Sequence, residues 1–131
     1  MTTLHHYFAR LEDTLNSRTE LDVKEIDIVE HEPDDQTGEF HARVGFYDAS
    51  LLEAVEKVSL ENGEIIKDQY SYHYQKSDGD LVFRYDNAPH HPEIETFPHH
   101  NHVGSDENVI ASHPPDMSEV LVEIDGVLYQ V

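Results

Sequence analysis

The stretch YSYHYQKSDGDLVFRY, residues 70–85, decides the fold. Tyrosines alternate with polar residues in its first half, apolar and aromatic residues return in its second half, and Asp78-Gly79 lies between the halves. Alternation with a period of two indicates a strand, and Asp-Gly supplies the two positive φ angles of a type I′ turn. The stretch therefore predicts two antiparallel strands, with Tyr70, Tyr72 and Tyr74 on one face of the first.

The segments before residue 70 show the same alternation. Apolar residues alternate with charged ones from Val23 to Ile28 and, most clearly, from Phe40 to Phe46. A third run, Leu52–Leu60, keeps its parity except at Glu56, and Asn62-Gly63 follows it as a second hairpin signal. Consecutive hairpins predict an antiparallel meander of about five strands.

One helix is expected at each end of the chain. Near the N-terminus, apolar residues recur at intervals of three and four, at Leu4, Phe8, Leu11 and Leu15. The segment Met117–Val131 also places its apolar residues on one helical stripe, and Asp116 with Glu119 has the form of a capping box. Asp125-Gly126 also fits a hairpin turn, but the run Val120-Leu121-Val122 breaks any alternation and favours the helix.

Composition limits the class of protein. The 131 residues include 28 acidic and 8 basic side chains, a formal net charge of −20, and no cysteine. We expect a single α+β domain over residues 1–131, without disulfides or cysteine-ligated zinc. No apolar stretch approaches the roughly 18 residues of a membrane span. Because the N-terminal residues also lack the features of a secretory signal, we expect a cytoplasmic protein without a membrane partner.

The acidic residues are spread along the whole chain, while lysine falls to four positions, Lys24, Lys57, Lys67 and Lys76. So large a charge of one sign destabilises a compact state unless salt screens it. The pattern therefore indicates a halophilic protein from a salt-accumulating cytoplasm. A DNA mimic, or a protein with a basic partner, is the alternative interpretation.

A histidine- and proline-rich segment, at about residues 87–115, is the candidate functional loop. Five of the 11 histidines lie between His90 and His102, and Pro89, Pro92 and Pro98 stiffen the same stretch. The segment begins where the last meander strand ends, so its side chains are expected at an edge of the sheet.

Three interpretations of these histidines are open. In a metal site, His100 and His102 point the same way from an extended chain, and zinc or another transition ion takes a third ligand from His90, His91 or Asp86. In a metal-free site, one imidazole removes the proton of a ribose 2′-hydroxyl and another protonates the leaving 5′-oxygen. In the third interpretation, the histidines are structural hydrogen-bond partners that hold down a long loop.

The metal-free interpretation has four candidate imidazoles, His90, His99, His100 and His102, and uses Arg84 to neutralise the phosphorane charge. A surface salt bridge is the competing role for Arg84. Candidate substrate-binding residues are Tyr72, Tyr85 and Asn87, because stacking matters more than phosphate contacts in concentrated salt. For the tyrosines of Tyr70–Gln75, a role as cross-strand core partners is the competing interpretation.

Three runs together resemble the TumE-like family, whose members are toxin components of toxin–antitoxin pairs: Tyr70–Gln75, Phe83–His91 and Phe97–Val103. The resemblance is strongest from Tyr70 to Val103 and is compatible with the N-terminal helix and the early strands. It implies an antitoxin partner, expected to be a helix-turn-helix protein. It carries no catalytic residues over to this chain.

We therefore expect a toxin of a type II toxin–antitoxin module that acts on RNA through the segment from Arg84 to His102. The alternative comes from another class. It is a non-catalytic metal-binding or protein-interaction module, in which the histidines hold an ion or the fold.

The halophilic interpretation predicts that salt stabilises the fold. The melting temperature should rise steeply between about 0.1 M and about 2 M KCl, because the Debye length falls from about 10 Å to about 3 Å or less. Scanning calorimetry across this range measures the effect. A flat response would favour a basic partner over a salt-accumulating cytoplasm.

Overall fold

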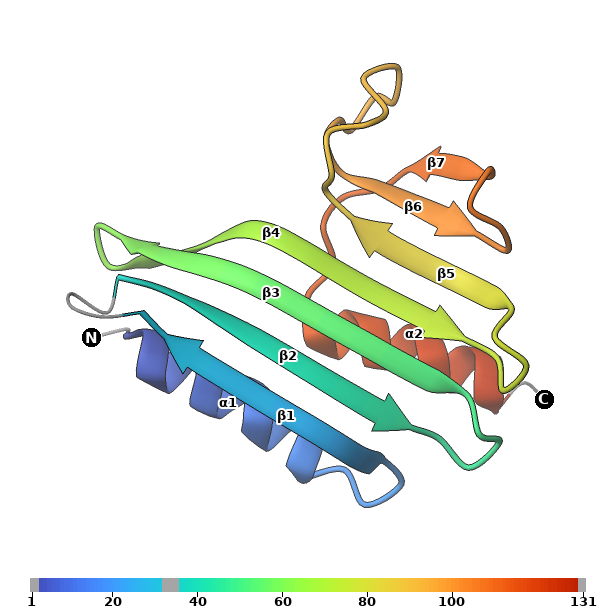
Figure 1. Ribbon diagram of the computed structural model, residues 1–131, viewed down its shortest axis with the longest axis horizontal. Coiled ribbons are helices and arrows are strands. Elements are labelled where there is room, and N and C mark those ends of the chain that lie inside the picture. Colours follow the sequence, from blue (N-terminus) through green and yellow to red (C-terminus); the bar gives the residue numbers. More distant parts are fainter. Residues whose placement is uncertain (1–2, 32–35, 130–131) are drawn as a thin grey trace.

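Successive hairpins place each strand beside the one before it, so the chain forms one seven-stranded antiparallel sheet in sequence order (Figure 1). The computed structural model describes residues 3–31 and 36–129. The strands are β1 (Asp22–Glu30), β2 (Thr37–Gly45), β3 (Leu51–Glu61), β4 (Glu64–Gln75), β5 (Leu81–Asp86), β6 (His100–Val103) and β7 (Val109–Ala111). The helices are α1 (Leu4–Asn16) and α2 (Met117–Leu128). The α+β prediction is confirmed.

The two hairpin signals give different turns. Asn62 and Gly63, between β3 and β4, have φ angles of 52° and 79°, as a type I′ turn requires. Between β4 and β5 the positive φ belongs to Gly79 alone, at 92°. Lys76 N donates to Asp80 O at 2.9 Å, and Gly79 N donates to Lys76 O at 2.9 Å. This is a three-residue loop, so the prediction of a second type I′ turn is wrong, although the antiparallel pairing follows.

Side chains cap both helices. The Thr3 hydroxyl accepts from His6 N at 3.1 Å at the start of α1. At the start of α2, Asp116 accepts from Glu119 N at 2.9 Å and Glu119 accepts from Asp116 N at 3.1 Å. This reciprocal pair is the predicted capping box, and the segment with Asp125-Gly126 is helical. Neither helix in the described part of the chain is long and apolar enough to cross a membrane.

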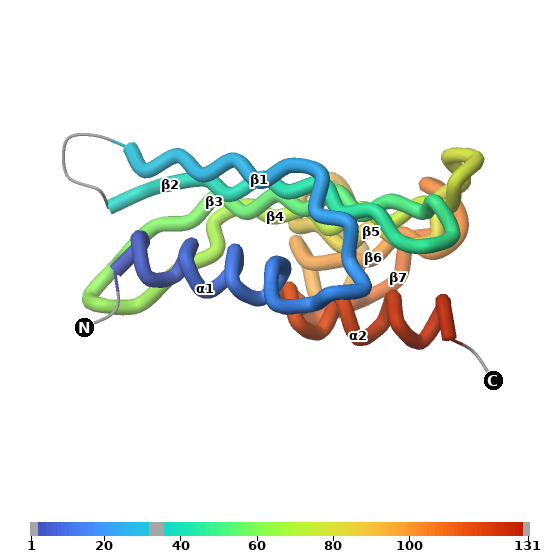
Figure 2. Tube along the Cα trace, turned by 90° about the horizontal axis from the view of Figure 1, so that it is seen from below, coloured from blue at the N-terminus to red at the C-terminus, as the bar shows by residue number. Residues whose placement is uncertain are grey.

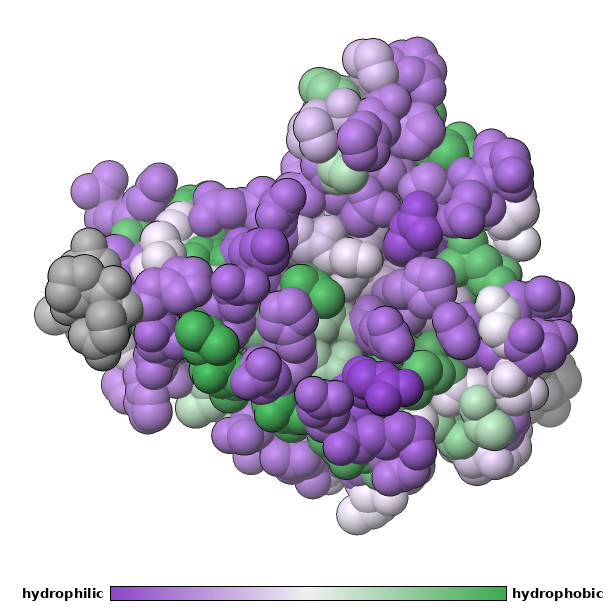
Figure 3. Space-filling model, in the orientation of Figure 1, coloured by the Kyte–Doolittle hydropathy of each residue, from purple (hydrophilic) through white to green (hydrophobic). Residues whose placement is uncertain are grey.

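The sheet has one covered face and one open face. Both helices lie against the same face (Figure 2). The buried residues on the helices are Leu4, Phe8, Leu11 and Leu15 in α1, and Met117, Val120, Leu121 and Ile124 in α2. Tyr70, Tyr72 and Tyr74 are buried with them, so their predicted core role is confirmed. The other face carries no helix and is mainly hydrophilic (Figure 3).

Two strands lie within the segment predicted as a loop. β6 has four residues and β7 has three, and they bring the sheet to seven strands in place of about five. Strands this short are below the length at which alternation can be recognised. Their pairing extends the sheet at its β5 edge, and it carries the histidines onto that edge.

A buried carboxylate joins the covered face of the sheet to both ends of the chain. Glu56, the residue that breaks the apolar parity of β3, is fully buried and accepts hydrogen bonds from the hydroxyls of Tyr7 and Tyr72. Lys67 Nζ lies 3.9 Å from Glu56 Oε2 and donates to Pro115 O at 2.8 Å. Burial, with Glu56 beside them, raises the pKa of both tyrosine hydroxyls, and burial lowers the pKa of Lys67.

Two glycine substitutions test the packing. A Cβ on Gly38 would lie 2.7 Å from Val29 O and 2.8 Å from Phe8 Cε2, whereas a Cβ on Gly126, within α2, meets nothing within 4 Å. Gly38→Ala should therefore lower the free energy of unfolding by about 1–3 kcal/mol. Gly126→Ala should raise it by up to about 1 kcal/mol through helix propensity. Urea unfolding of both variants measures this, and shifts of the same sign would contradict the described packing.

Candidate active site

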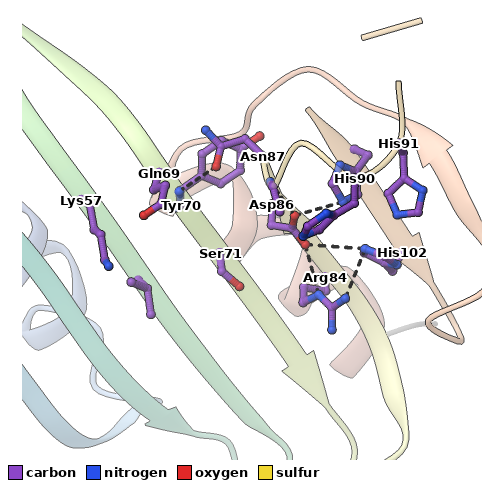
Figure 4. A pocket seen from close by; sticks show the side chains of 13 residues that line it. Lys57, Gln69, Tyr70, Ser71, Arg84, Asp86, Asn87, His90, His91 and His102 are labelled. Carbon is purple, nitrogen blue, oxygen red and sulfur yellow. Dashed lines mark hydrogen bonds and ion pairs between the residues drawn. The ribbon is translucent and has the colours of Figure 1, made fainter. Parts of the chain in front are cut away.

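The register of β5 and β6 brings four polar residues together on the open face. Asp86 pairs with His100 and Arg84 pairs with His102. Residues directly opposite each other share a face, as do residues two apart in one strand. All four side chains therefore project from the side that the helices leave uncovered, and Figure 4 shows Arg84, Asp86 and His102 close together.

The Asp86 carboxylate is the centre of this group. Its Oδ1 lies 3.0 Å from His100 Nε2 and accepts from Ala88 N at 3.0 Å. Its Oδ2 lies 3.1 Å from Arg84 Nε and 3.6 Å from His102 Nε2. The Asp86 side chain is only 12% exposed, and a carboxylate so buried needs such donors.

Arg84 links the group in three directions. Its Nε contacts Asp86. One terminal nitrogen of the guanidinium lies 3.0 Å from Asp106 Oδ1, and the other lies 3.2 Å from His102 Nε2. A guanidinium carries five N–H donors, so two are left for a bound anion.

Backbone carbonyls fix the orientation of both imidazoles. His100 Nδ1 donates to Pro98 O at 2.8 Å, and His102 Nδ1 donates to Asp106 O at 2.9 Å. Because a guanidinium only donates, His102 Nε2 accepts from Arg84 at 3.2 Å and so carries a lone pair. His100 Nε2 faces Asp86 Oδ1 at 3.0 Å, a contact that needs a proton between the two atoms. A proton donor and a proton acceptor thus lie side by side, with ring centroids 4.9 Å apart.

Burial favours a neutral His102. The side chains of His100 and His102 are 2% and 5% exposed. Burial lowers the pKa of His102, the nearby positive charge of Arg84 lowers it further, and the hydrogen bond to the Asp106 carbonyl opposes the shift. A neutral ring, whose Nε2 lone pair accepts from Arg84, is therefore the favoured form of His102 near pH 7.

The group lines a pocket of about 390 Å³ on the open face, within the usual size of small-ligand sites (Figures 3 and 4). His90 and His91 from the β5–β6 connection also line this pocket. Its sheet side is lined by Val55, Lys57, Gln69, Tyr70 and Ser71. Because the antiparallel register sets these neighbours, residues from four strands, β3 to β6, and from one connection share one pocket.

His91 completes a cluster of three imidazoles. Its ring centroid lies 4.9 Å from that of His100 and 5.7 Å from that of His102. One ring nitrogen from each of the three residues lies within 4.8 Å of the others. The structure thus brings together His91, His100 and His102, three of the proposed metal ligands, with the fourth, Asp86, in contact with two of them.

Other candidate residues lie outside the pocket. Tyr72 and Tyr85 are cross-strand partners on the covered face, where Tyr72 is fully buried and Tyr85 donates to Glu123 of α2. His99 stacks on Tyr70 and contacts its hydroxyl at 2.9 Å, in a separate pocket beside α2. Strand parity therefore points Tyr72 and Tyr85, the predicted substrate-binding tyrosines, toward the covered face and away from the open-face pocket.

Asn87 lines the pocket but uses its amide in the fold. Its Oδ1 accepts from Tyr70 N at 3.1 Å, and its Nδ2 donates to Asp68 O at 3.0 Å (Figure 4). Because β5 ends at Asp86, the Asn87 side chain takes the place of a strand partner for β4.

Sequence reasoning missed Asp106 and two residues of the pocket lining, Lys57 and Ser71. Asp106 lies in the β6–β7 turn, and its carbonyl and carboxylate hold His102 and Arg84. Gly104 and Ser105 were a turn signal for this position, and Gly104 has a φ of 77°. The alternation of β3 and β4 was a signal for Lys57 and Ser71, since both lie opposite the apolar face of their strands.

The comparisons identify a family. Residues 9–128 match the model of the family described as Toxin TumE. This range includes both helices apart from Leu4–Phe8 of α1, all seven strands and every residue of the pocket. No curated protein and no solved structure matches the chain.

Two acidic residues with contrasting exposure test the role of Asp86. Asp86→Asn places an amide N–H₂ against donors already aimed at a carboxylate, so it should lower the free energy of unfolding by roughly 1–3 kcal/mol. Asp106 is 68% exposed and also pairs with Arg84, so Asp106→Asn should cost less than about 1 kcal/mol. Denaturant unfolding compares them. An equal cost for the two variants would contradict a central role for Asp86.

Proposed function

The chain belongs to the TumE toxin family, and on this premise we propose that it is the toxin of a type II toxin–antitoxin module that cleaves RNA in the pocket around Asp86. The observation that carries the proposal is the 3.0 Å contact between His100 Nε2 and Asp86 Oδ1, next to His102, whose Nδ1 donates to a backbone carbonyl. Cleavage of RNA by its own 2′-hydroxyl needs a proton acceptor and a proton donor in one site.

In the proposed reaction, His102 Nε2 takes the proton of the 2′-hydroxyl. The 2′-oxygen then bonds to phosphorus, the bond from phosphorus to the 5′-oxygen breaks, and that oxygen takes the proton held by His100 and Asp86. The products are a 2′,3′-cyclic phosphate and a 5′-hydroxyl. One proton is accepted and one is donated, so no further reactant is consumed.

Arg84 serves the phosphate in this scheme. Its two remaining N–H donors can bind the phosphorane oxygens as charge develops. Without substrate, a terminal nitrogen of Arg84 lies 3.2 Å from His102 Nε2. A bound phosphate draws the guanidinium toward itself and so frees the Nε2 lone pair for the 2′-hydroxyl. Exposed Lys57 and His90 at the pocket offer a second cationic contact and a ring on which a base can stack.

The acidic surface restricts where RNA can bind. A net charge of −20 repels a phosphate backbone, so attraction must come from the few cationic groups gathered at the pocket. In the concentrated salt of a halophilic cytoplasm this repulsion is screened, which favours short contacts over long-range attraction. We propose that the protein acts in the cytoplasm and that a helix-turn-helix antitoxin, encoded beside it, restrains it.

Cleavage of a mixed RNA pool at about 2 M KCl, in the presence of a chelator, tests the proposal. His102→Ala should lower the rate roughly 10²- to 10⁴-fold, because it removes the proton acceptor. His41→Ala is the matched control, since His41 lies on the same open face in β2, is 44% exposed and is not part of the pocket lining. It should keep full activity.

An RNA substrate with 2′-deoxyribose at the cleaved position should not be cut, because it lacks the attacking 2′-hydroxyl. Intact RNA after incubation with the wild-type protein, or equal rates for His102→Ala and His41→Ala, would contradict the proposed function.

A further inference from the structure

Three imidazoles in the pocket have the spacing of a transition-metal site. One nitrogen from each of His91, His100 and His102 lies within 4.8 Å of the others. Around a tetrahedral zinc ion with bonds of about 2.1 Å, ligand atoms lie about 3.4 Å apart. His91 is 29% exposed on a connecting segment, so a small rotation of its ring closes the difference.

The hydrogen bonds around the rings are those of metal-bound histidine. Metal-ligating imidazoles donate their other N–H to a carbonyl or carboxylate, which fixes the tautomer. Here His100 Nδ1 donates to Pro98 O and His102 Nδ1 donates to Asp106 O, at 2.8 Å and 2.9 Å. Both Nε2 atoms are thereby aimed into the pocket, and Asp86 oxygens lie 3.0 Å and 3.6 Å from them.

We infer that His91, His100 and His102 bind one divalent ion of the zinc class, with the Asp86 carboxylate beside them. The ion takes the His102 lone pair and replaces the proton at His100 Nε2. Both are the atoms that the proposed cleavage uses, so metal binding inhibits the toxin. This inhibition rests on the proposed function, whereas the binding itself does not.

The charges around the cluster favour a cation. Asp86 touches two of the rings, Glu93 Oε1 lies 3.4 Å from His91 Nδ1, and the whole chain carries a net charge of −20. The opposing group is Arg84, whose terminal nitrogen lies 3.2 Å from His102 Nε2 and has to move when the ion binds. Its contacts with Asp86 and Asp106 can stay in place. Imidazole ligands select zinc, copper, nickel or cobalt over magnesium.

Titration of the chelator-treated full-length protein with Co²⁺ tests the site without RNA, because tetrahedral cobalt with nitrogen ligands has a visible absorption band. We expect one Co²⁺ per chain, displacement by Zn²⁺ and no displacement by Mg²⁺. His91→Ala should weaken binding by more than about tenfold. Its partial exposure makes it the variant that keeps the fold, whereas His100 is 2% exposed.

His73→Ala is the control for adventitious binding to surface groups. His73 lies on the open face opposite Arg84, yet belongs to neither the cluster nor the pocket lining. It should bind Co²⁺ like the wild type. Equal affinity of the wild type and His91→Ala, or no absorption band, would overturn the site.

RNA cleavage with added Zn²⁺ then separates the two proposals. The inhibitory site is supported if cleavage by the wild type falls in proportion to Zn²⁺ occupancy. At the same Zn²⁺ concentration, cleavage by His91→Ala should not fall. Cleavage that rises with Zn²⁺ overturns the inhibition and the metal-free chemistry together. A stoichiometric Co²⁺ site in a protein that never cleaves RNA supports the site and overturns the proposed function, leaving a non-catalytic metal-binding module.

Discussion

The site depends on the contacts of one carboxylate, Asp86. It is the last residue of β5, it is 12% exposed, and it meets Arg84, His100 and a backbone N–H in a chain with 28 acidic and 8 basic side chains. Most carboxylates of such a chain stay in water, where they need no partner. A desolvated one collects cations and N–H donors around it, so Asp86 orders the imidazoles beside it.

Most of the fold could be predicted from short sequence patterns. Three predictions rested on patterns only a few residues long, and all three are confirmed. They are the tyrosine alternation in β4, the Asn62-Gly63 turn and the Asp116 capping box. β6 and β7 escaped prediction because pairing with a neighbour, and no pattern of their own, makes them strands. Glu56 broke the parity of β3 for a similar reason, since its hydroxyl partners come from distant segments.

The site was only partly visible in the sequence. The crowding of histidines and the pair Arg84 and Asp86 marked the segment that lines the pocket, but the face on which each side chain lies depends on register. His99, just before β6, contacts Tyr70 away from the other candidates, and the pairing of β5 with β4 points Tyr85 toward α2. Similarly, the contacts of Asp106 with His102 and Arg84 arise from a turn, and a turn has no periodic pattern that would predict them.

The most direct test of the account is the protonation of the two imidazoles that face Asp86, read from ¹⁵N chemical shifts in the wild type and in Asp86→Asn. At neutral pH we expect His102 to carry its proton on Nδ1 alone, and we expect the chemical shift of His100 Nε2 to differ between the wild type and Asp86→Asn. Two results would contradict the central role of Asp86. One is protonation of His102 on Nε2, and the other is equal ¹⁵N chemical shifts of His100 in the wild type and in Asp86→Asn.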